Sequence, residues 1–153
     1  MTGEPEPIAR ALLAAGVLFF DPDGRVLLVK PTYKDGWEVP GGHVLPGESP
    51  SAAAVREVAE ELGVTAPLGP LLVVDWAPMG PEDRVLLLFD GGVLDDAQQA
   101  RLSPDGVEIG EVAFRPAGQL GELLPARLAR RVLAGIAARA AGRTDYLEHG
   151  VRG

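Results

Sequence analysis

The sequence lacks cysteine entirely, which excludes disulfides, thiolate metal sites and cysteine nucleophiles together. Histidine is nearly absent as well, because only His43 and His149 carry an imidazole. Two histidines are too few for a histidine-rich metal cluster. Any metal site must therefore consist mainly of oxygen ligands, and such ligands favour Mg²⁺ or Mn²⁺ over softer metals.

The chain also lacks a hydrophobic run of the ~18 residues that a membrane-spanning helix needs. The longest candidate, Ala11–Phe20, is shorter than that. Its flanks do not suit a signal peptide, because acidic Glu4 and Glu6 precede it and the turn sequence Asp21–Gly24 follows it. We therefore expect no membrane partner and a cytoplasmic location.

Positive charge is scarce, with 14 lysines and arginines against 22 aspartates and glutamates and a formal net charge of −8. A protein that binds nucleic acid polymers without sequence preference needs a basic surface, so we expect no such partner. A small nucleotide remains compatible with this charge, because divalent cations can bridge carboxylates to phosphates.

What is present suffices for one globular domain: 153 residues, 46% of them hydrophobic, with no internal repeat. We expect a flexible N-terminal lead over residues 1–7 and a single domain over residues 8–153. The sequence leaves the oligomeric state open, a homodimer included.

The order of predicted elements is mixed. Apolar runs predict strands over Ala11–Phe20 and Arg25–Lys30, joined as a hairpin by the turn at Asp21–Gly24. Glycine and proline predict a loop over residues 41–47. Further extended segments are expected over Trp37–Val39, Leu71–Trp76, Val85–Phe89 and Val107–Phe114. Mostly strands, with one helix early and one late, indicate an α+β or α/β sandwich around a mixed sheet.

Two helices are predicted from their ends and their periodicity. The first has Ser49 as N-cap and Pro50 in the first turn, and it runs to Leu62 before Gly63 stops it. The second covers residues 125–141 before a glycine. Its arginines are expected to form a solvated face: Arg127, Arg130, Arg131 and Arg139.

The first helix carries an acidic cluster. At 100° per residue, Glu57, Glu60 and Glu61 share one face. That face should point away from the sheet, because the apolar side of the helix should pack on it: Ala52, Val55, Val58, Ala59 and Leu62. Like charges four residues apart disfavour a helix by about 0.2–0.5 kcal/mol, whereas a divalent cation makes them its ligands. Three glutamates on a helix, taken alone, are more often an ordinary solvated acidic face.

The loop before the helix favours a ligand site over a plain acidic surface. Gly41, Gly42 and Gly47 allow the backbone to bend tightly and to approach a ligand without a Cβ in the way. A glycine loop that leads into a helix N-terminus is a common anion-binding device. Arg56 lies beside the glutamates and can hold a carboxylate in one rotamer.

Residues 42–64 match every specified position of the Nudix box, so the sequence resembles the Nudix hydrolase family. The pattern is glycine, five residues, glutamate, seven residues, then Arg-Glu-aliphatic-any-Glu-Glu-any-Gly-aliphatic. Seven fixed identities occur by chance at roughly one start in a million or fewer. The matching positions are Gly42, Glu48, Arg56, Glu57, Val58, Glu60, Glu61, Gly63 and Val64.

The resemblance implies an α/β/α sandwich with a mixed β-sheet, and hydrolysis of a nucleoside diphosphate linked to another moiety. It also implies Mg²⁺ or Mn²⁺, with Glu57, Glu60, Glu61 and the Gly42 carbonyl as metal ligands. Arg56 would orient the carboxylates, and Glu48 would brace the junction of loop and helix or reach a metal through water. Water made more acidic by the metal would attack phosphorus while a carboxylate removes its proton.

The identity of the base and of the substrate contacts stays open. In this family the base is a box glutamate or an acidic residue from a later loop, where turn and surface carboxylates are also common. The later candidates are Asp105, Glu108 and Glu111. Weaker candidates for substrate contact are Trp37, Trp76, His43 and Lys34, although a buried tryptophan more often belongs to the core.

Two other functions compete with the enzyme. One is a non-catalytic Nudix-like module that senses a nucleotide, which usually requires the loss of a box carboxylate. The other is a scaffold with an acidic helix and no ligand. Pro78 and Pro81 lie near the place of a proline shared by ADP-ribose hydrolases, but the offset is not clean. Oxidised or ordinary nucleoside triphosphates therefore remain equal candidates as substrates.

Overall fold

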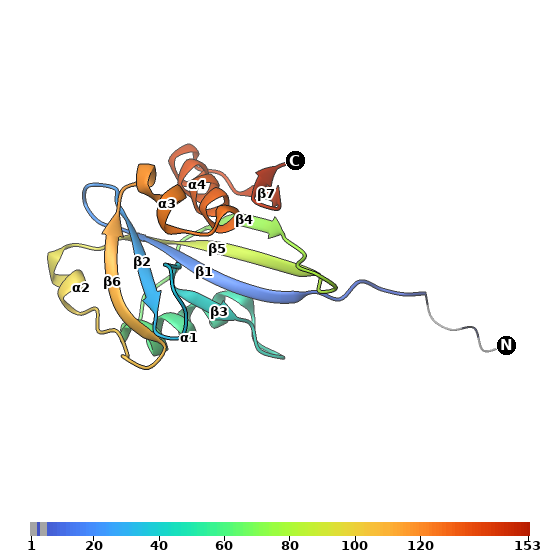
Figure 1. The fold of residues 1–153 in the computed structure, drawn as a ribbon, viewed down its shortest axis with the longest axis horizontal. Coiled ribbons are helices and arrows are strands. Elements are labelled where there is room, and N and C mark those ends of the chain that lie inside the picture. The colour runs from blue at the N-terminus through green and yellow to red at the C-terminus, as the bar shows by residue number, and fades with distance from the viewer. Residues whose placement is uncertain (1–2, 4–5) are drawn as a thin grey trace.

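Eight strands form one mixed sheet in the computed structural model, which describes residue 3 and residues 6–153 (Figure 1). The hydrogen-bonded order of the strands is β6-β2-β1-β5-β4-β7-β8, and β3 pairs with β1 beside this path. The β1–β5 and β4–β7 pairs are parallel and the others antiparallel. The expected flexible lead, residues 1–7, falls largely on residues 1–2 and 4–5, which lie outside the described part.

The strand bounds confirm the apolar runs that predict them. The sheet contains β1 (Leu12–Phe20), β2 (Val26–Pro31), β3 (Gly41–His43), β4 (Leu71–Trp76), β5 (Arg84–Val93), β6 (Ile109–Arg115), β7 (Asp145–Glu148) and β8 (Val151–Arg152). The predicted hairpin between β1 and β2 is present, with Gly24 at φ 83° in its turn and Asp21 accepting backbone hydrogen bonds from Asp23 and Arg25.

Helices cover both faces of the sheet, which confirms the α/β sandwich (Figure 1). On one face α1 (Pro50–Leu62) packs Ala54, Val58 and Leu62 against buried residues of β1 and β2. On the other face lie α3 (Leu120–Leu123) and α4 (Ala126–Ala141), and α4 packs Ala129 and Val132 into a second apolar cluster. Among the described residues, no helix is both long enough and apolar enough to cross a lipid bilayer.

Several predictions of local structure are wrong. The predicted loop over residues 41–47 begins with β3, which pairs with Ala14–Gly16 of β1. The pairing is so close that a Cβ at Gly41 would lie 2.2 Å from the carbonyl oxygen of Ala15, so glycine marks a tight strand contact here and not a loop. Five short elements were not predicted: α2 (Asp96–Ala100), η1 (Ala117–Gln119), α3, β7 and β8.

The arginines of α4 form the expected solvated face only in part, because Arg130 alone is exposed and the other three are buried or half-buried. Arg131 is buried and donates to buried Asp75 of β4 at 2.6 Å. Arg139 pairs with Asp90 of β5 at 3.0 Å, and Arg130 donates to the carbonyl of His149. These side chains fasten α4 to the sheet and to the β7–β8 turn, because carboxylates and carbonyls on neighbouring elements are within reach.

Candidate active site

The ends of α1 are as predicted. The Ser49 side chain accepts from the backbone N–H of Ala52 at 3.1 Å, and Pro50 occupies the first turn, where it loses no helical hydrogen bond. Gly63 ends the helix in the left-handed conformation at φ 69°. These caps fix where α1 begins and ends, and so fix the rotation of its acidic residues relative to β3.

The buried side of α1 differs from the expected one. Ala52 and Ala59 are exposed, whereas Ala53, Ala54 and Glu61 are buried. The prediction that the carboxylates point away from the sheet is therefore wrong for Glu61, which is only 5% exposed. Small alanines carry little apolar area, so larger side chains on the helix decide its rotation and turn Glu61 inward.

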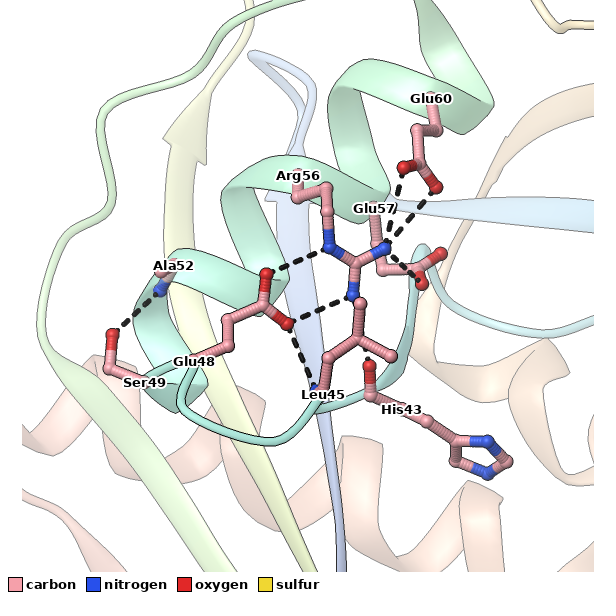
Figure 2. A network of polar contacts seen from close by, with 8 residues as sticks. All are labelled: His43, Leu45, Glu48, Ser49, Ala52, Arg56, Glu57 and Glu60. Atoms are coloured by element: carbon pink, nitrogen blue, oxygen red, sulfur yellow. Dashed lines mark hydrogen bonds and ion pairs between the residues drawn. The ribbon is translucent and has the colours of Figure 1, made fainter.

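Arg56 organises the junction between α1 and the preceding loop (Figure 2). Its guanidinium bonds both oxygens of Glu48, with Nε–Oε2 at 2.8 Å and NH2–Oε1 at 3.0 Å. It also donates to Glu57 Oε1 at 2.9 Å and to the carbonyl of His43 at 3.1 Å. The bond to Arg56 is the main reason that the pKa of Glu48 lies below its usual value, and the same pair raises the pKa of Arg56.

Gly42 leaves the space that the Glu57 carboxylate occupies. A Cβ at Gly42 would lie 2.5 Å from Glu57 Cδ and 2.7 Å from Glu57 Oε1, distances at which the two groups cannot coexist. The backbone of β3 and this carboxylate therefore lie in direct contact. The glycine is required here for close approach, as its lack of a side chain predicts.

Glu61 lies beside β3 in an environment that disfavours its charge. It is buried, and the one hydrogen bond that its carboxylate accepts from the described residues comes from the backbone N–H of Gly41 at 3.3 Å. The pKa of Glu61 is raised to about 8, chiefly by burial and also by the negative charge of Glu57, while the Gly41 bond opposes the rise. A buried carboxyl group with a displaced pKa is typical of functional sites.

The loop before β6 carries Glu108 and is held in place by Asp105. Asp105 Oδ1 accepts from the backbone N–H groups of Val107, Glu108 and Ile109 at 2.9–3.0 Å. The bond from Ile109 is the largest of the causes that lower the pKa of Asp105. The N–H of Asp105 donates to the Glu61 carbonyl at 3.1 Å. The loop is thereby tied to the end of α1.

Three carboxylates meet as a result. Oxygen atoms of Glu57, Glu61 and Glu108 all lie within 4.8 Å of one another. We call this group the carboxylate triad. Its members come from α1 and from the loop before β6, and the sequence alone could not show which of the later acidic residues would join the helix.

The other predicted site residues lie outside the triad. Glu60 is exposed and its carboxylate lies toward Arg56, 3.3 Å away. Glu111 pairs with Lys30 at 3.6 Å, and Lys34 pairs with Glu38. Asp105 acts on the backbone of its own loop.

The two tryptophans and the histidine that were candidates for substrate contact lie in different parts of the fold. Trp37 is half-buried against the α4-side cluster, with Lys30 Nζ 5.8 Å from its ring centre. Trp76 is half-buried on β4. His43 is exposed on β3, next to Gly42. Because side chains alternate along a strand and Gly42 faces Glu57, the side chain of His43 lies on the face of β3 away from the triad.

One residue near the triad was not singled out from the sequence. Tyr33 is 69% exposed, and its pKa is raised by burial of part of the ring and then by carboxylates that include Glu38, Glu61 and Glu108. A lone tyrosine in a loop carries no sequence signal, because only the fold brings it near these acids.

The chemistry available at the triad is that of a hard cation site. Three carboxylates and nearby backbone carbonyls offer oxygen ligands only, which suit Mg²⁺ and Mn²⁺. The triad concentrates negative charge that neither Arg56 nor any other described basic residue fully neutralises, because Arg56 reaches Glu57 alone among the three. A divalent cation fits this donor set.

Comparisons with known proteins agree with this geometry. The sequence model of the NUDIX domain matches residues 10–134. The human diphosphoinositol polyphosphate phosphohydrolase 3-alpha is 43% identical over 91 residues, 58% of this chain and 52% of that protein. The chain thus spans about half the length of this relative.

Two further proteins extend the similarity. A Bacillus subtilis (strain 168) protein named provisionally as an 8-oxo-dGTP diphosphatase is 34% identical over 106 residues, 69% of this chain and 67% of that one. The crystal structure of a MutT protein from Methanosarcina mazei Go1 superposes with a TM-score of 0.69, covering 88% of this chain and 96% of that chain. Its identity is 20%, so this likeness concerns the fold alone.

Proposed function

The chain belongs to the Nudix family, and on that basis we propose that it is a metal-dependent hydrolase that cuts a diphosphate linkage by attack of water at phosphorus. The observation that carries the proposal is the carboxylate triad, three oxygen donors within 4.8 Å contributed by two separate elements. An acidic surface without a ligand would not need Glu61 to be buried beside two like charges.

We assign the metal to Glu57, Glu61 and the Gly42 carbonyl, and Glu60 remains a further proposed ligand. A bound Mg²⁺ or Mn²⁺ would offset charge on the diphosphate oxygens and make a coordinated water more acidic. Arg56 holds Glu57 by one hydrogen bond and Glu48 by two, so it keeps the ligand rotamers in place before any ion arrives. Glu48 acts by bracing the loop, because it also accepts from the N–H of Leu45 at 3.1 Å.

We propose Glu108 as the base that removes the proton from the attacking water. It is the exposed member of the triad, so solvent reaches it, and its loop is positioned by Asp105. Asp105 itself is occupied by three backbone N–H groups. Glu111 interacts with Lys30 away from the triad. Neither of the other later candidates is therefore available for this role.

The substrate is a small molecule in which a diphosphate links a nucleoside, or a comparable group, to another moiety. Nucleoside triphosphates and ADP-ribose follow from the resemblance in residues 42–64. The name of one relative supports the oxidised nucleotides among these, and the name of another adds diphosphoinositol polyphosphates.

A panel of these compounds with Mg²⁺ or Mn²⁺ tests the proposal. We expect release of a monophosphate product from at least one compound, loss of more than a hundredfold in kcat for Glu61→Gln, and incorporation of ¹⁸O from labelled water into a phosphate product. A protein that binds a panel member but cuts none would instead be a nucleotide sensor. Activity that persists in EDTA would refute metal dependence.

A further inference from the structure

A cluster of arginines lies where the first turns of α4 pass over the β4–β5 hairpin, on the sheet face opposite α1. Buried Arg131 pairs with buried Asp75 at 2.6 Å. Arg84 contacts Met79 and Arg127 contacts the adjacent Pro78, so these two side chains lie close together. Burial lowers the pKa of Arg131, Asp75 opposes this, and the charges of Arg84 and Arg127 lower it further. Among the described residues, Asp75 is the only carboxylate that pairs with any of the three. Positive charge is thus in excess here, in a chain of net charge −8.

Arg84 has no adequate acceptor in this cluster. Its one side-chain hydrogen bond within the described part of the chain is to the thioether sulfur of Met79, at 3.4 Å. Its Nε is buried and has no hydrogen-bond partner among those residues, and the same holds for Nε of Arg127. A partly desolvated charge without a counter-charge is unfavourable. The other terminal nitrogen of Arg84 is neither buried nor paired, so a ligand can reach it.

The remaining contacts of the cluster are structural. Arg127 donates to the carbonyl of Pro78 at 2.9 Å and contacts His149 Nδ1 at 2.7 Å. Arg130 donates twice to the carbonyl of His149. These bonds hold the arginine side chains in place without neutralising them, because neither a carbonyl nor an imidazole carries a negative charge. The arginine side chains are therefore held in place before any anion binds, and the described residues leave part of their positive charge uncompensated.

Strand register places Arg84 on the same face of the sheet as His43. His43, Ala14 and Leu86 are directly paired across β3, β1 and β5, and Arg84 precedes Leu86 by two residues. Ala14 is only half-buried although β1 lies within the sheet, so this part of the face is incompletely covered. Two strand spacings and two residues separate the Cα atoms of His43 and Arg84 by roughly 12 Å. Gly42, the neighbour of His43, faces Glu57 on the α1 side, so a substrate that is cut at the triad has to pass the edge of β3 to reach Arg84. An extended phosphorylated molecule is long enough to do so.

We propose that Arg84 and Arg127 bind a phosphate group of the substrate that lies remote from the diphosphate being cut. The inference rests on the proposed function for the cut itself. It narrows the substrate class to diphosphate compounds that carry a further phosphate ester at the far end. A guanidinium suits this role because its planar fork matches phosphate oxygens, and a doubly charged phosphate offsets the excess charge of the cluster.

Matched pairs of compounds that differ only in a remote phosphate test the proposal kinetically. Suitable pairs are NADPH with NADH, and coenzyme A with dephospho-coenzyme A; a diphosphoinositol polyphosphate extends the series. In the Mg²⁺-loaded protein, we expect Arg84→Gln to raise KM at least tenfold for the phosphorylated member while kcat changes less than twofold. The unphosphorylated member should be unaffected, and Arg84→Lys should show an intermediate KM.

Arg101→Gln is the matched control, because it removes one positive charge, as Arg84→Gln does, but from an exposed position at the C-terminal end of α2. An equal rise in KM for Arg101→Gln, or an Arg84→Gln effect that is the same for both members of a pair, would refute the site. Arg84 is the primary variant because its replacement removes only a weak contact with sulfur, whereas Arg127 holds neighbouring backbone in place.

Binding without metal separates this inference from the proposed function. Inositol hexakisphosphate, titrated calorimetrically in EDTA, should bind the wild-type protein and bind Arg84→Gln at least tenfold more weakly. Loss of binding with increasing salt is also expected. If the protein cuts no diphosphate but shows this difference, the function fails and the anion site stands. If the protein is active and the probe binds both forms equally, the anion site alone fails.

Discussion

Glu61 should lower the stability of the metal-free protein, and its replacement by glutamine should raise it. The carboxyl group is 5% exposed, has one backbone donor at 3.3 Å and belongs to a group of like charges. Its pKa is raised from the ordinary 4.5 to about 8, chiefly by burial. In the folded protein the group therefore prefers to be protonated, whereas in the unfolded chain it ionises freely.

The sign of the pH dependence follows from these two pKa values. Below about pH 4.5 both states are protonated and the group does not affect stability. Between pH 4.5 and 8 the unfolded chain releases the proton first, so stability falls by about 1.4 kcal/mol for each pH unit. Above pH 8 the penalty is constant, at about 5 kcal/mol as an upper limit, and relaxation of the site should reduce it by roughly half.

Glutamine avoids this penalty because it is neutral at every pH. Its carbonyl can accept from the Gly41 N–H, and its amide can donate to Glu57, so the replacement leaves no polar group without a partner. We expect a gain of about 2–3 kcal/mol at pH 8, equivalent to roughly 5–10 °C in Tm. Thermal melts of the wild type and Glu61→Gln in EDTA at pH 5, 6.5 and 8 measure the gain.

Glu60→Gln is the control, because Glu60 is on the same helix but exposed, and it should stay within ~0.5 kcal/mol of the wild type. Mn²⁺ at one thousand times Kd should reverse the order, since only the wild type gains the stabilisation of a bound ion, about 4.1 kcal/mol at that concentration. A Glu61→Gln protein that is less stable than the wild type in EDTA at pH 8, or a gain that does not shrink toward pH 5, would refute this reasoning.

Three further outcomes are expected from the geometry of the site. Gly42→Ala should weaken Mn²⁺ binding at least tenfold, as measured by calorimetry. Its Tm should change little, because the new Cβ displaces only the flexible end of Glu57. In the control Gly118→Ala nothing lies within 4 Å of the new Cβ, so Mn²⁺ binding and Tm should both stay unchanged. Arg56→Lys should lower kcat roughly tenfold, because an ammonium group cannot bond both Glu48 oxygens and Glu57 together, and unchanged kinetics would show that the clamp is dispensable. Asp105→Ala should lower the free energy of unfolding at pH 7 through the loss of three accepted N–H bonds, and it should reduce kcat as strongly as Glu108→Gln. Because the pKa of Asp105 is lowered in the fold, denaturant melts should show that its stabilising contribution is present above about pH 4 and disappears in acid.

The helix that carries the site was predictable because its signals are local. A capping serine, a proline in the first turn and a terminal glycine act within one or two turns, and α1 begins and ends where they indicate. The strands with long apolar runs were predictable for the same reason. The extended Gly41–His43 segment was not, because the pairing that makes it a strand comes from Ala14–Gly16, about 27 residues away in the chain.

For a related reason, the sequence could not predict which later acidic residue completes the triad. Asp105, Glu108 and Glu111 are equivalent by charge and by position in the chain. What separates them is the capping of the loop by Asp105 and the register of β6 against β2, which places Glu111 opposite Lys30. A shift by one residue in that register would exchange the faces of the strand, so no local pattern could have singled out Glu108.

The larger errors concern charges that the fold buries. Both Glu61 and Arg131 were expected in solvent, because burial of an ionisable group is unfavourable on average. The two are handled differently: Arg131 has Asp75 as its counter-charge, at 2.6 Å, whereas Glu61 has only a backbone N–H and two like charges. A buried ion that already has a partner within the chain serves to fasten two elements together. A buried ion without one leaves the folded protein less stable than it could be, and a ligand of opposite charge can recover that free energy on binding. By this criterion the described residues support the two sites that we propose, one for a cation at the triad and one for an anion at Arg84.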